Sequence, residues 1–274
     1  DTTVFTINGL AAQTQYDVYI RSICAVGDTS AWAGPYTVTT AYTVPFVETF
    51  DDMANVLFPA DWTRYKLIKY ADLIAGTKSF DTAEPYTSTS SSENVWGYNS
   101  YNKNALEDAN HITIELYDDY SDSWMLSPVI DLSTVAANEA LEFSFDAALT
   151  YWSDSVAPTS TSTQKFYIIV SEDGGSTWTA ANTTTWGETG SNYLLSSIPE
   201  GAGTSYEFDF SKYAGKTIRI AFGIEVEENH NRLHLDNIAL KRIVTRDYTA
   251  TACNSTDYMD DYFFIAQQDL VLGN

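Results

Sequence analysis

The sequence of 274 residues is poor in the residue types that several function classes need. It has 14 Lys plus Arg against 37 Asp plus Glu, a formal net charge of -23, so nucleic acid and anionic membrane surfaces would be repelled. Only Cys24 and Cys253 are present, which excludes a disulfide-rich framework, and no CxxC metal spacing occurs. No apolar run approaches the ~20 residues of a membrane-spanning helix. Divalent cations, basic partners and neutral sugars are compatible with this acidity, which in the simplest interpretation only keeps the protein soluble.

The short motifs that carry catalysis are also missing from the sequence. It contains no GxSxG, Walker or dinucleotide-binding signature. His230 and His234 have the i,i+4 spacing of a zinc helix, but the flanking pattern predicts a loop followed by a strand, with no Glu between them. Glycoside hydrolysis needs two carboxyls about 5 to 10 Å apart across a cleft, and nothing in the sequence specifies such a pair. We therefore predict that the chain is not an enzyme.

Strand patterns dominate what is present. Aromatic residues make up 14% of the chain, and Ser and Thr recur throughout. From residue 218 to residue 226, apolar side chains alternate strictly with others, which predicts a strand buried on one face: Ile218, Ile220, Phe222, Ile224 and Val226. A second strand follows and carries Asp236 among apolar residues, where its carboxylate needs backbone donors or a cation. The sequence predicts an all-β, antiparallel sandwich.

Residues 1–41 form a separate pattern with three expected strands, over residues 2–10, 15–26 and 35–42. Leu10, followed after three residues by Thr14-Gln15-Tyr16 and a strand, resembles the C-terminal half of a fibronectin type III domain. The resemblance implies that Tyr16 is the tyrosine-corner residue, whose hydroxyl bonds to nearby backbone. It also implies that the first strands of that domain precede Asp1, so we expect a piece of a longer polypeptide. Residues 43–45 are expected to be a short linker.

A series of landmarks between residues 42 and 245 resembles a second family. In order they are VETFDD at 47–52, FPADW at 58–62, SWMLSPVIDLS at 123–133, SEDGGSTW at 171–178, FSKYAGKTIRIAF at 210–222 and LDNIAL at 235–240. Together they resemble the MAM-like and cleaved-adhesin jelly-roll domains of secreted Bacteroidota proteins. The resemblance implies an antiparallel jelly-roll-like β-sandwich that is largely non-catalytic. Residues 246–274 are expected to be a linker or the start of a further module.

The same resemblance implies a structural calcium ion. Its ligands would be Glu48 and Asp51 from the first strand region and Asp236 from the last strand, because these strands are neighbours in such sheets. The alternative is that Asp51 and Asp52 cap a turn and that Asp236 accepts hydrogen bonds from backbone N–H groups. The chain has no DxDxDG loop, so an EF-hand is excluded.

Aromatic residues in polar stretches are candidates for stacking on sugar rings. The sequence places four of them so: Trp96, Tyr98, Tyr101 and Trp152. Packing within the local structure is the alternative for each. Trp62, Trp124 and Trp178 lie in the family landmarks and are expected to be core residues.

The stretch from Ser171 to Trp178 has the spelling of an Asp-box, which recurs around sialidase propellers. One copy without a four-stranded repeat predicts a structural hairpin. In it, Asp173 bonds turn amides, Gly174 and Gly175 supply positive φ, and Trp178 packs beneath.

Two short patterns of the Asp-Ser/Thr-apolar type, which Bacteroidota use for O-glycosylation, centre on Thr82 and Ser155. The type III resemblance implies that Cys24 and Cys253 pair with cysteines outside this chain. A Cys24–Cys253 bridge is the competing interpretation and requires Cα atoms within ~7 Å.

Taken together, the resemblances imply a calcium-stabilised, non-catalytic adhesion or binding module of a larger secreted or cell-surface protein. Its ligand would be a glycan or a protein on a surface, and its other contacts would be neighbouring domains of the same polypeptide. A structural spacer or fibre subunit without its own ligand is one alternative. An accessory domain of a secreted protease or glycosidase is another.

Overall fold

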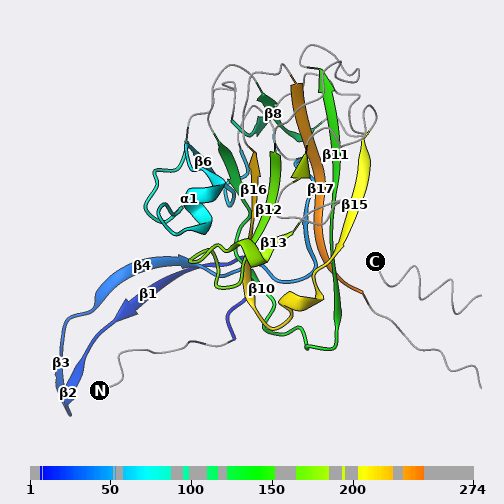
Figure 1. Ribbon diagram of the computed structural model, residues 1–274. Helices are drawn as coiled ribbons and strands as arrows, with labels where there is room; N and C mark the ends of the chain where they lie inside the picture. Colours follow the sequence, from blue (N-terminus) through cyan, green and yellow to red (C-terminus); the bar gives the residue numbers. More distant parts are fainter. Residues whose placement is uncertain are drawn as a thin grey trace, which may run out of the picture.

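The computed structural model describes residues 7, 9–51, 53, 58–87, 95–98, 110–116, 122–151, 165–184, 193–194, 203–224 and 231–243. These residues form a β-sandwich of two large antiparallel sheets, from which a two-stranded ribbon projects (Figure 1). The expected all-β, jelly-roll-like sandwich is confirmed. No helix among these residues has the length and apolar character to span a membrane.

The sheet that we name the front sheet has six described strands. Its order is β15 (Thr204–Asp209), β11 (Ala140–Tyr151), β17 (Asn231–Ile243), β8 (Ile112–Leu116) and β7 (Gly97–Tyr98), with β5 (Phe46–Glu48) also paired to β17. Strands β11 and β17 are long and run side by side through its centre (Figure 1).

The second sheet, which we name the back sheet, has seven described strands. Its order is β13 (Thr183–Thr184), β12 (Lys165–Ser171), β16 (Thr217–Ile224), β9 (Ser123–Leu126) and β6 (Thr63–Lys66). Two short strands join it at the side: β10 (Ile130–Asp131) pairs with β16 and β14 (Tyr193–Leu194) with β12. Consecutive strands repeatedly cross between the two sheets, so the core between them is held by contacts distant in sequence.

The alternation in β16 produces the main core as predicted. Ile218, Ile220, Phe222 and Ile224 are fully buried between the sheets, while Val226 lies outside the described residues. The prediction that only one face of this strand is buried is wrong, because Ala221 on the other face is also fully buried. Gly223 lies beneath the ring of Trp124, where a Cβ would come within 2.3 Å of the indole carbons. The alternation in β16 could not reveal that its other face is buried too, because Ala221 and Gly223 on that face are small residues covered by a segment distant in sequence.

That covering segment is the stretch between β6 and β7. It contains the short helix α1 (Tyr70–Ile74) and builds a second core on the outward side of the back sheet. Tyr70 stacks on Tyr167 with ring centroids 4.3 Å apart, and the indole N–H of Trp124 donates to the carbonyl of Ile68 at 2.6 Å. The outward side of the back sheet is therefore largely occupied by the protein itself.

The N-terminal ribbon consists of β1 (Gln15–Ile20) and β4 (Ala33–Thr39), with β2 (Ile23–Ala25) and β3 (Asp28–Thr29) at its far end (Figure 1). The second and third expected strands are thus present, and most of the first lies outside the described residues. The N–H of Ala11 donates to the hydroxyl of Tyr16 at 2.9 Å, as expected for a tyrosine corner. That this ribbon belongs to a fibronectin type III domain stays a prediction.

Tyr42 anchors the ribbon to the sandwich. Its N–H donates to the carbonyl of Val129 at 2.9 Å, and its carbonyl accepts from the N–H of Asp131 at 2.7 Å. Its ring packs edge-on against Phe46 and its hydroxyl bonds the carboxylate of Asp61. Burial and this carboxylate raise the pKa of Tyr42 to about 12. The expected linker at residues 43–45 therefore begins directly after a residue that is hydrogen-bonded to the sandwich.

Candidate functional site

The outward face of the front sheet is the best candidate for a binding surface, because the second core covers the corresponding face of the back sheet. In β11, Phe143, Phe145 and Ala147 point into the core, so Ser144 and Asp146 between them point outward. Strand pairing then assigns the outward residues of the neighbouring strands. This face divides into an open half along β15 and a buried half along β8.

The open half is polar and mostly acidic. Across β11 and β15, the outward pairs are Glu142 with Asp209, Ser144 with Glu207 and Asp146 with Ser205. Ser205, Glu207 and Asp209 are exposed, and their β11 partners are half-buried. Hydroxyl and carboxylate groups thus stand at fixed positions on these two strands.

A β-bulge at Asn237 shapes the centre of this face. Ser144 pairs with Ala239 but Asp146 pairs with Asp236, so β17 has one residue more than β11 between these pairs. Asn237 takes up the extra residue with φ of 49°, a left-handed conformation that Asn tolerates better than most residues. Its side-chain amide donates to Asp146 at 2.8 Å, and the hydroxyl of Ser205 bonds the other carboxylate oxygen of Asp146.

The buried half contains a chain of hydrogen bonds through two histidines. His234 lies 2.8 Å from the hydroxyl of Thr150 through Nε2 and 2.8 Å from Nε2 of His111 through Nδ1, and all three residues are fully buried. Burial, His111 and the charge of Arg232 hold the pKa of His234 well below its usual value, so this imidazole is neutral at pH 7. Arg232 in turn is paired with Glu115 at 2.8 Å.

Sequence reasoning found only part of this network. It correctly placed His234 on a strand, whereas His230 lies outside the described residues. The contact between His111 and His234 depends on the register of β8 against β17, across more than a hundred residues. Periodicity in one strand carries no information about that register.

The expected calcium ligands are divided between two faces. The first and last strands are adjacent, as predicted, since β5 pairs with β17. Glu48 pairs with buried Ile238 and so points inward, where its carboxylate accepts from the N–H of Phe50 at 2.9 Å and the indole of Trp62 at 3.1 Å. Asp236 pairs with Asp146 and is on the outward side of the sheet.

The remaining contacts of these acids are hydrogen bonds within the protein. Asp236 accepts a hydrogen bond from the N–H of Asn237 at 2.7 Å, and Asp51 is exposed and bonds Asn110 through its carbonyl. In the part of the chain that the structure describes, no three His, Cys, Asp or Glu residues are placed to hold a metal ion. Calcium stabilisation stays a prediction.

Of the four expected sugar-stacking residues, Trp96 is the one whose side chain the structure describes. Trp96 is fully buried in the main core, with its ring 6.3 Å from that of Phe166, so the prediction that it stacks on a ligand is wrong. Its carbonyl accepts from Arg64 at 2.6 Å, which links the edges of the two sheets. Tyr98 is in β7, opposite Ile112, and Tyr101 and Trp152 lie outside the described residues. Trp62, Trp124 and Trp178 are buried, as expected.

The Asp-box is structural, as predicted. Asp173 accepts from the N–H and hydroxyl of Thr177 at 2.9 and 2.7 Å and from the hydroxyl of Ser171 at 2.6 Å. Burial alone would raise the pKa of Asp173, but these hydrogen bonds lower it overall. Gly174 and Gly175 have φ of 74° and 111°, and the indole of Trp178 donates to the carbonyl of Gly175 at 2.9 Å.

Two further predicted positions are on the surface. Thr82 is exposed, and its hydroxyl lies 3.3 Å from the carbonyl of Ser79, while Ser155 lies outside the described residues. Cys24 is exposed at the far end of the ribbon and has no disulfide partner among the described residues, while Cys253 lies outside them. Glycosylation of Thr82 and the pairing of the cysteines stay predictions.

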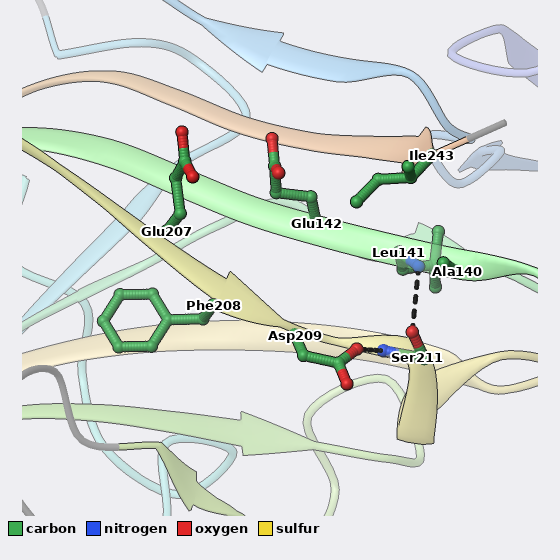
Figure 2. Close-up of a pocket in the computed structure, with 8 residues that line it drawn as sticks. All are labelled: Ala140, Leu141, Glu142, Glu207, Phe208, Asp209, Ser211 and Ile243. Carbon is green, nitrogen blue, oxygen red and sulfur yellow. Dashed lines mark hydrogen bonds between the residues drawn. The ribbon is translucent and has the colours of Figure 1, made fainter. Parts of the chain in front are cut away.

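A hollow of 280 Å³ lies at one end of the open half of the front sheet. Figure 2 shows the residues that line it: Ala140, Leu141, Glu142, Glu207, Phe208, Asp209, Ser211 and Ile243. The side chains of Glu142, Glu207 and Ile243 project on the same side of the strands (Figure 2). Hydrogen bonds from Ser211 lower the pKa of Asp209, which keeps its carboxylate charged.

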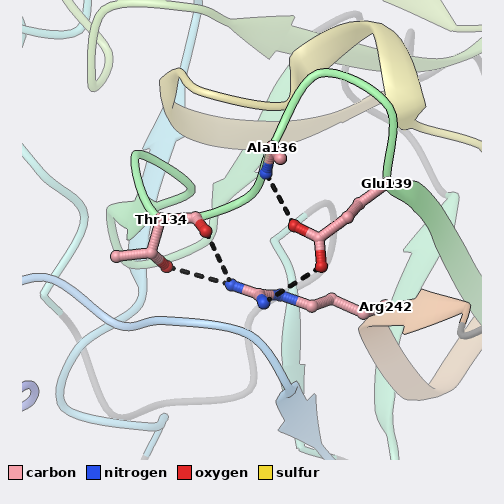
Figure 3. Close-up of polar contacts among 4 residues, drawn as sticks. All are labelled: Thr134, Ala136, Glu139 and Arg242. Carbon is pink, nitrogen blue, oxygen red and sulfur yellow. Dashed lines mark hydrogen bonds and ion pairs between the residues drawn. The ribbon is translucent and has the colours of Figure 1, made fainter.

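A brace of polar contacts supports this end of the sheet. Arg242 contacts Glu139 at 3.3 Å and donates to the carbonyl and hydroxyl of Thr134 at 3.2 and 3.0 Å (Figure 3). The other oxygen of Glu139 accepts from the N–H of Ala136 at 2.6 Å. The brace ties the end of β17 to the loop before β11, and thereby holds Ile243 and Ala140 in place.

Comparison with known proteins identifies likenesses of fold. No family model and no curated protein matches the chain. The K1 cleaved adhesin domain of Lys-gingipain from Porphyromonas gingivalis W83 is 14% identical, with a TM-score of 0.43, over 73% of this chain and 99% of that domain. The K3 cleaved adhesin domain of the same protein is 13% identical, with a TM-score of 0.41, over 72% and 96%.

A carbohydrate-binding module has a similar fold. The family 11 module of a cellulosomal cellulase from Clostridium thermocellum is 13% identical, with a TM-score of 0.37, over 75% of this chain and 99% of that module. Identities and TM-scores this low concern the fold alone, so the function has to be argued from the site.

Proposed function

We propose that the chain is a non-catalytic binding module of a secreted or cell-surface protein, which recognises a glycan or a protein through the open half of the front sheet. The observation that supports this most is the Asp146 cluster at the β-bulge. Asn237 and Ser205 orient the Asp146 carboxylate on the open half of the front sheet, while the other large face of the sandwich is covered by the second core. Bulges of this kind commonly redirect a side chain at a functional surface.

A structural calcium ion is part of this proposal. Such an ion binds only the folded state and raises the melting temperature by mass action. Melting of the chain in millimolar calcium and in chelator tests it, and equal midpoints would exclude an ion that contributes to stability.

The spacer without its own ligand is the second candidate, and the burial of Trp96 favours it, because one of the four expected aromatic residues cannot stack on a sugar. An accessory role beside a protease or glycosidase is compatible with either candidate. The full polypeptide sequence would identify such a neighbour.

Glycan and extracellular-protein arrays probed with the full chain distinguish binding module from spacer. For any ligand found, we expect Asp146→Asn to weaken binding at least about tenfold, the loss of one well-placed charged hydrogen bond. Asp17→Asn is the matched control, because Asp17 also accepts a cross-strand hydroxyl, from Thr37 at 2.8 Å, but on the ribbon. No ligand on any array would favour the spacer, and a ligand whose binding both variants weaken equally would place the binding site away from Asp146.

A further inference from the structure

The hollow at the end of β11 and β15 has an apolar floor and an acidic rim. Ala140 and Ile243 are a cross-strand pair on the outward face and form part of the floor. Glu142, Glu207 and Asp209 stand around them, and Glu207 and Asp209 are exposed. An aliphatic stem ending in a positive charge is complementary to this combination, because the stem covers the floor while the head meets the carboxylates.

We propose that this hollow is a receptor for a lysine or arginine side chain, and that the partner of the module is a basic polypeptide segment lying along the open half of the front sheet. This inference rests on the proposed function and narrows its ligand to one class.

The size of the hollow favours a single side chain. Its volume of 280 Å³ is just below the roughly 300 to 1,000 Å³ of sites for drug-sized ligands. A carbohydrate chain would moreover require a stacking platform, and the described outward positions of β11, β15 and β17 include no aromatic residue. Those positions carry Glu142, Asp146, Glu207 and Asp209 instead.

The charge around the hollow also selects a cation. Lys241 faces Glu142 from β17 but does not line the hollow, whereas three carboxylates do. The net charge of -23 on the whole chain adds a long-range field that attracts basic partners and repels acidic ones. A cationic side chain is favoured over a metal ion, since among the described acids no group of three has a metal-binding arrangement.

The test uses the isotope-labelled 274-residue chain and a neutral-ended peptide, acetyl-Gly-Gly-Lys-Gly-Gly-amide, with backbone amide shifts as the readout. We expect the peptide to shift the amides of residues 140–142 and 207–211. The same peptide with norleucine in place of lysine keeps the stem without the charge and should leave these amides unchanged. An arginine peptide should act as lysine does, and salt at about 0.5 M should weaken both.

Paired variants separate the hollow from general attraction to an acidic protein. The double variant Glu142→Gln, Glu207→Gln should bind the lysine peptide about fivefold more weakly or worse, in line with the loss of two surface ion pairs. Asp28→Asn with Glu84→Gln removes the same charge from exposed sites elsewhere and should leave the affinity within about twofold. Circular dichroism confirms that each double variant is folded.

Each other outcome overturns the inference in a recognisable way. Equal losses in the two double variants, or equal binding of the norleucine peptide, would mean that the hollow does not select a cationic side chain. Calcium chloride that shifts the same amides more strongly than the peptide would make it a metal site. A neutral oligosaccharide that shifts them when the lysine peptide does not would make it a sugar subsite, and the proposed binding function would still stand.

Discussion

The side-chain amide of Asn237 donates a hydrogen bond to the carboxylate of Asp146 at 2.8 Å. Asn237 is the extra residue of β17 in the β-bulge opposite β11. The contact joins a strand irregularity to the outward polar groups of the front sheet. Neither residue would reach the other in a regular ladder, because adjacent residues of a strand point to opposite faces.

The bulge predicts the behaviour of two substitutions at Asn237. Asn237→Gly keeps the left-handed backbone but loses the amide, so the free energy of unfolding should fall by about 1 kcal/mol. Asn237→Ala loses the same amide and, unlike glycine, keeps a Cβ in the left-handed conformation. Its free energy of unfolding should therefore be about 1 kcal/mol lower than that of Asn237→Gly. Urea unfolding of both variants measures the difference. Equal stability of the two would show that the left-handed backbone at position 237 is not under strain.

A Cβ at Gly223 should disrupt the second core. In Gly223→Ala the methyl would lie 2.3 Å from a ring carbon of Trp124, so the indole or the strand must move, at a cost of about 2 to 3 kcal/mol. Gly97→Ala is the control, because its nearest neighbours are 3.8 Å away and it should change stability by less than about 0.5 kcal/mol. Thermal unfolding checks both, and a stable Gly223→Ala variant would contradict the packing of Trp124 over β16.

Tyr42 should make the protein sensitive to alkaline pH. Burial and Asp61 raise its pKa from 10.0 to about 12, so the folded state keeps a proton that the unfolded chain releases. The stability that this retained proton contributes to the folded state is fully present below pH 10 and is lost as the pH rises toward 12. Urea midpoints measured across that window should fall in the parent chain and fall less in Tyr42→Phe, which has no hydroxyl to titrate. Parallel pH profiles would contradict the contact with Asp61.

The stability of the Asp-box turn should depend on the carboxylate of Asp173. Asp173→Ala removes the acceptor of the Thr177 N–H and hydroxyl and of the Ser171 hydroxyl, and should lower the free energy of unfolding by about 1 to 2 kcal/mol. Ser176→Ala removes one exposed contact of 3.3 Å in the same turn and should be nearly neutral. Chemical denaturation measures the free energy of unfolding of both variants. Equal losses would mean that the turn keeps its conformation without the carboxylate of Asp173.

Local patterns predicted what depends on local physics. The alternation at 218–224 predicted the inward face of β16, and the spelling from Ser171 to Trp178 predicted a turn held by its own Asp. The corner at Tyr16 was also anticipated, with its hydroxyl bonded to Ala11. The contacts of the Asp-box and of the Tyr16 corner lie within a few residues, and the alternation of β16 is a pattern of neighbouring residues, so the sequence carries these signals directly.

The candidate site was predicted less well because its contacts are distant in sequence. Trp96 lies near a polar stretch, yet the edge of the sandwich encloses it. Glu48 and Asp236 are on neighbouring strands, as expected, but strand pairing points them to opposite sides of the sheet. The register that decides both outcomes is set by packing across the whole sheet, which no single strand encodes.

The sequence by itself determined the fold class, the strands and the acidity of this protein, because hydrophobic period and charge act within each segment. Only the tertiary structure decided which face stays open. The segment around α1 covers the back sheet, and the bulge at Asn237 aims polar groups outward from the front sheet. These outcomes depend on which distant segments bury one another, and burial is a property of the assembled sandwich rather than of any stretch of chain.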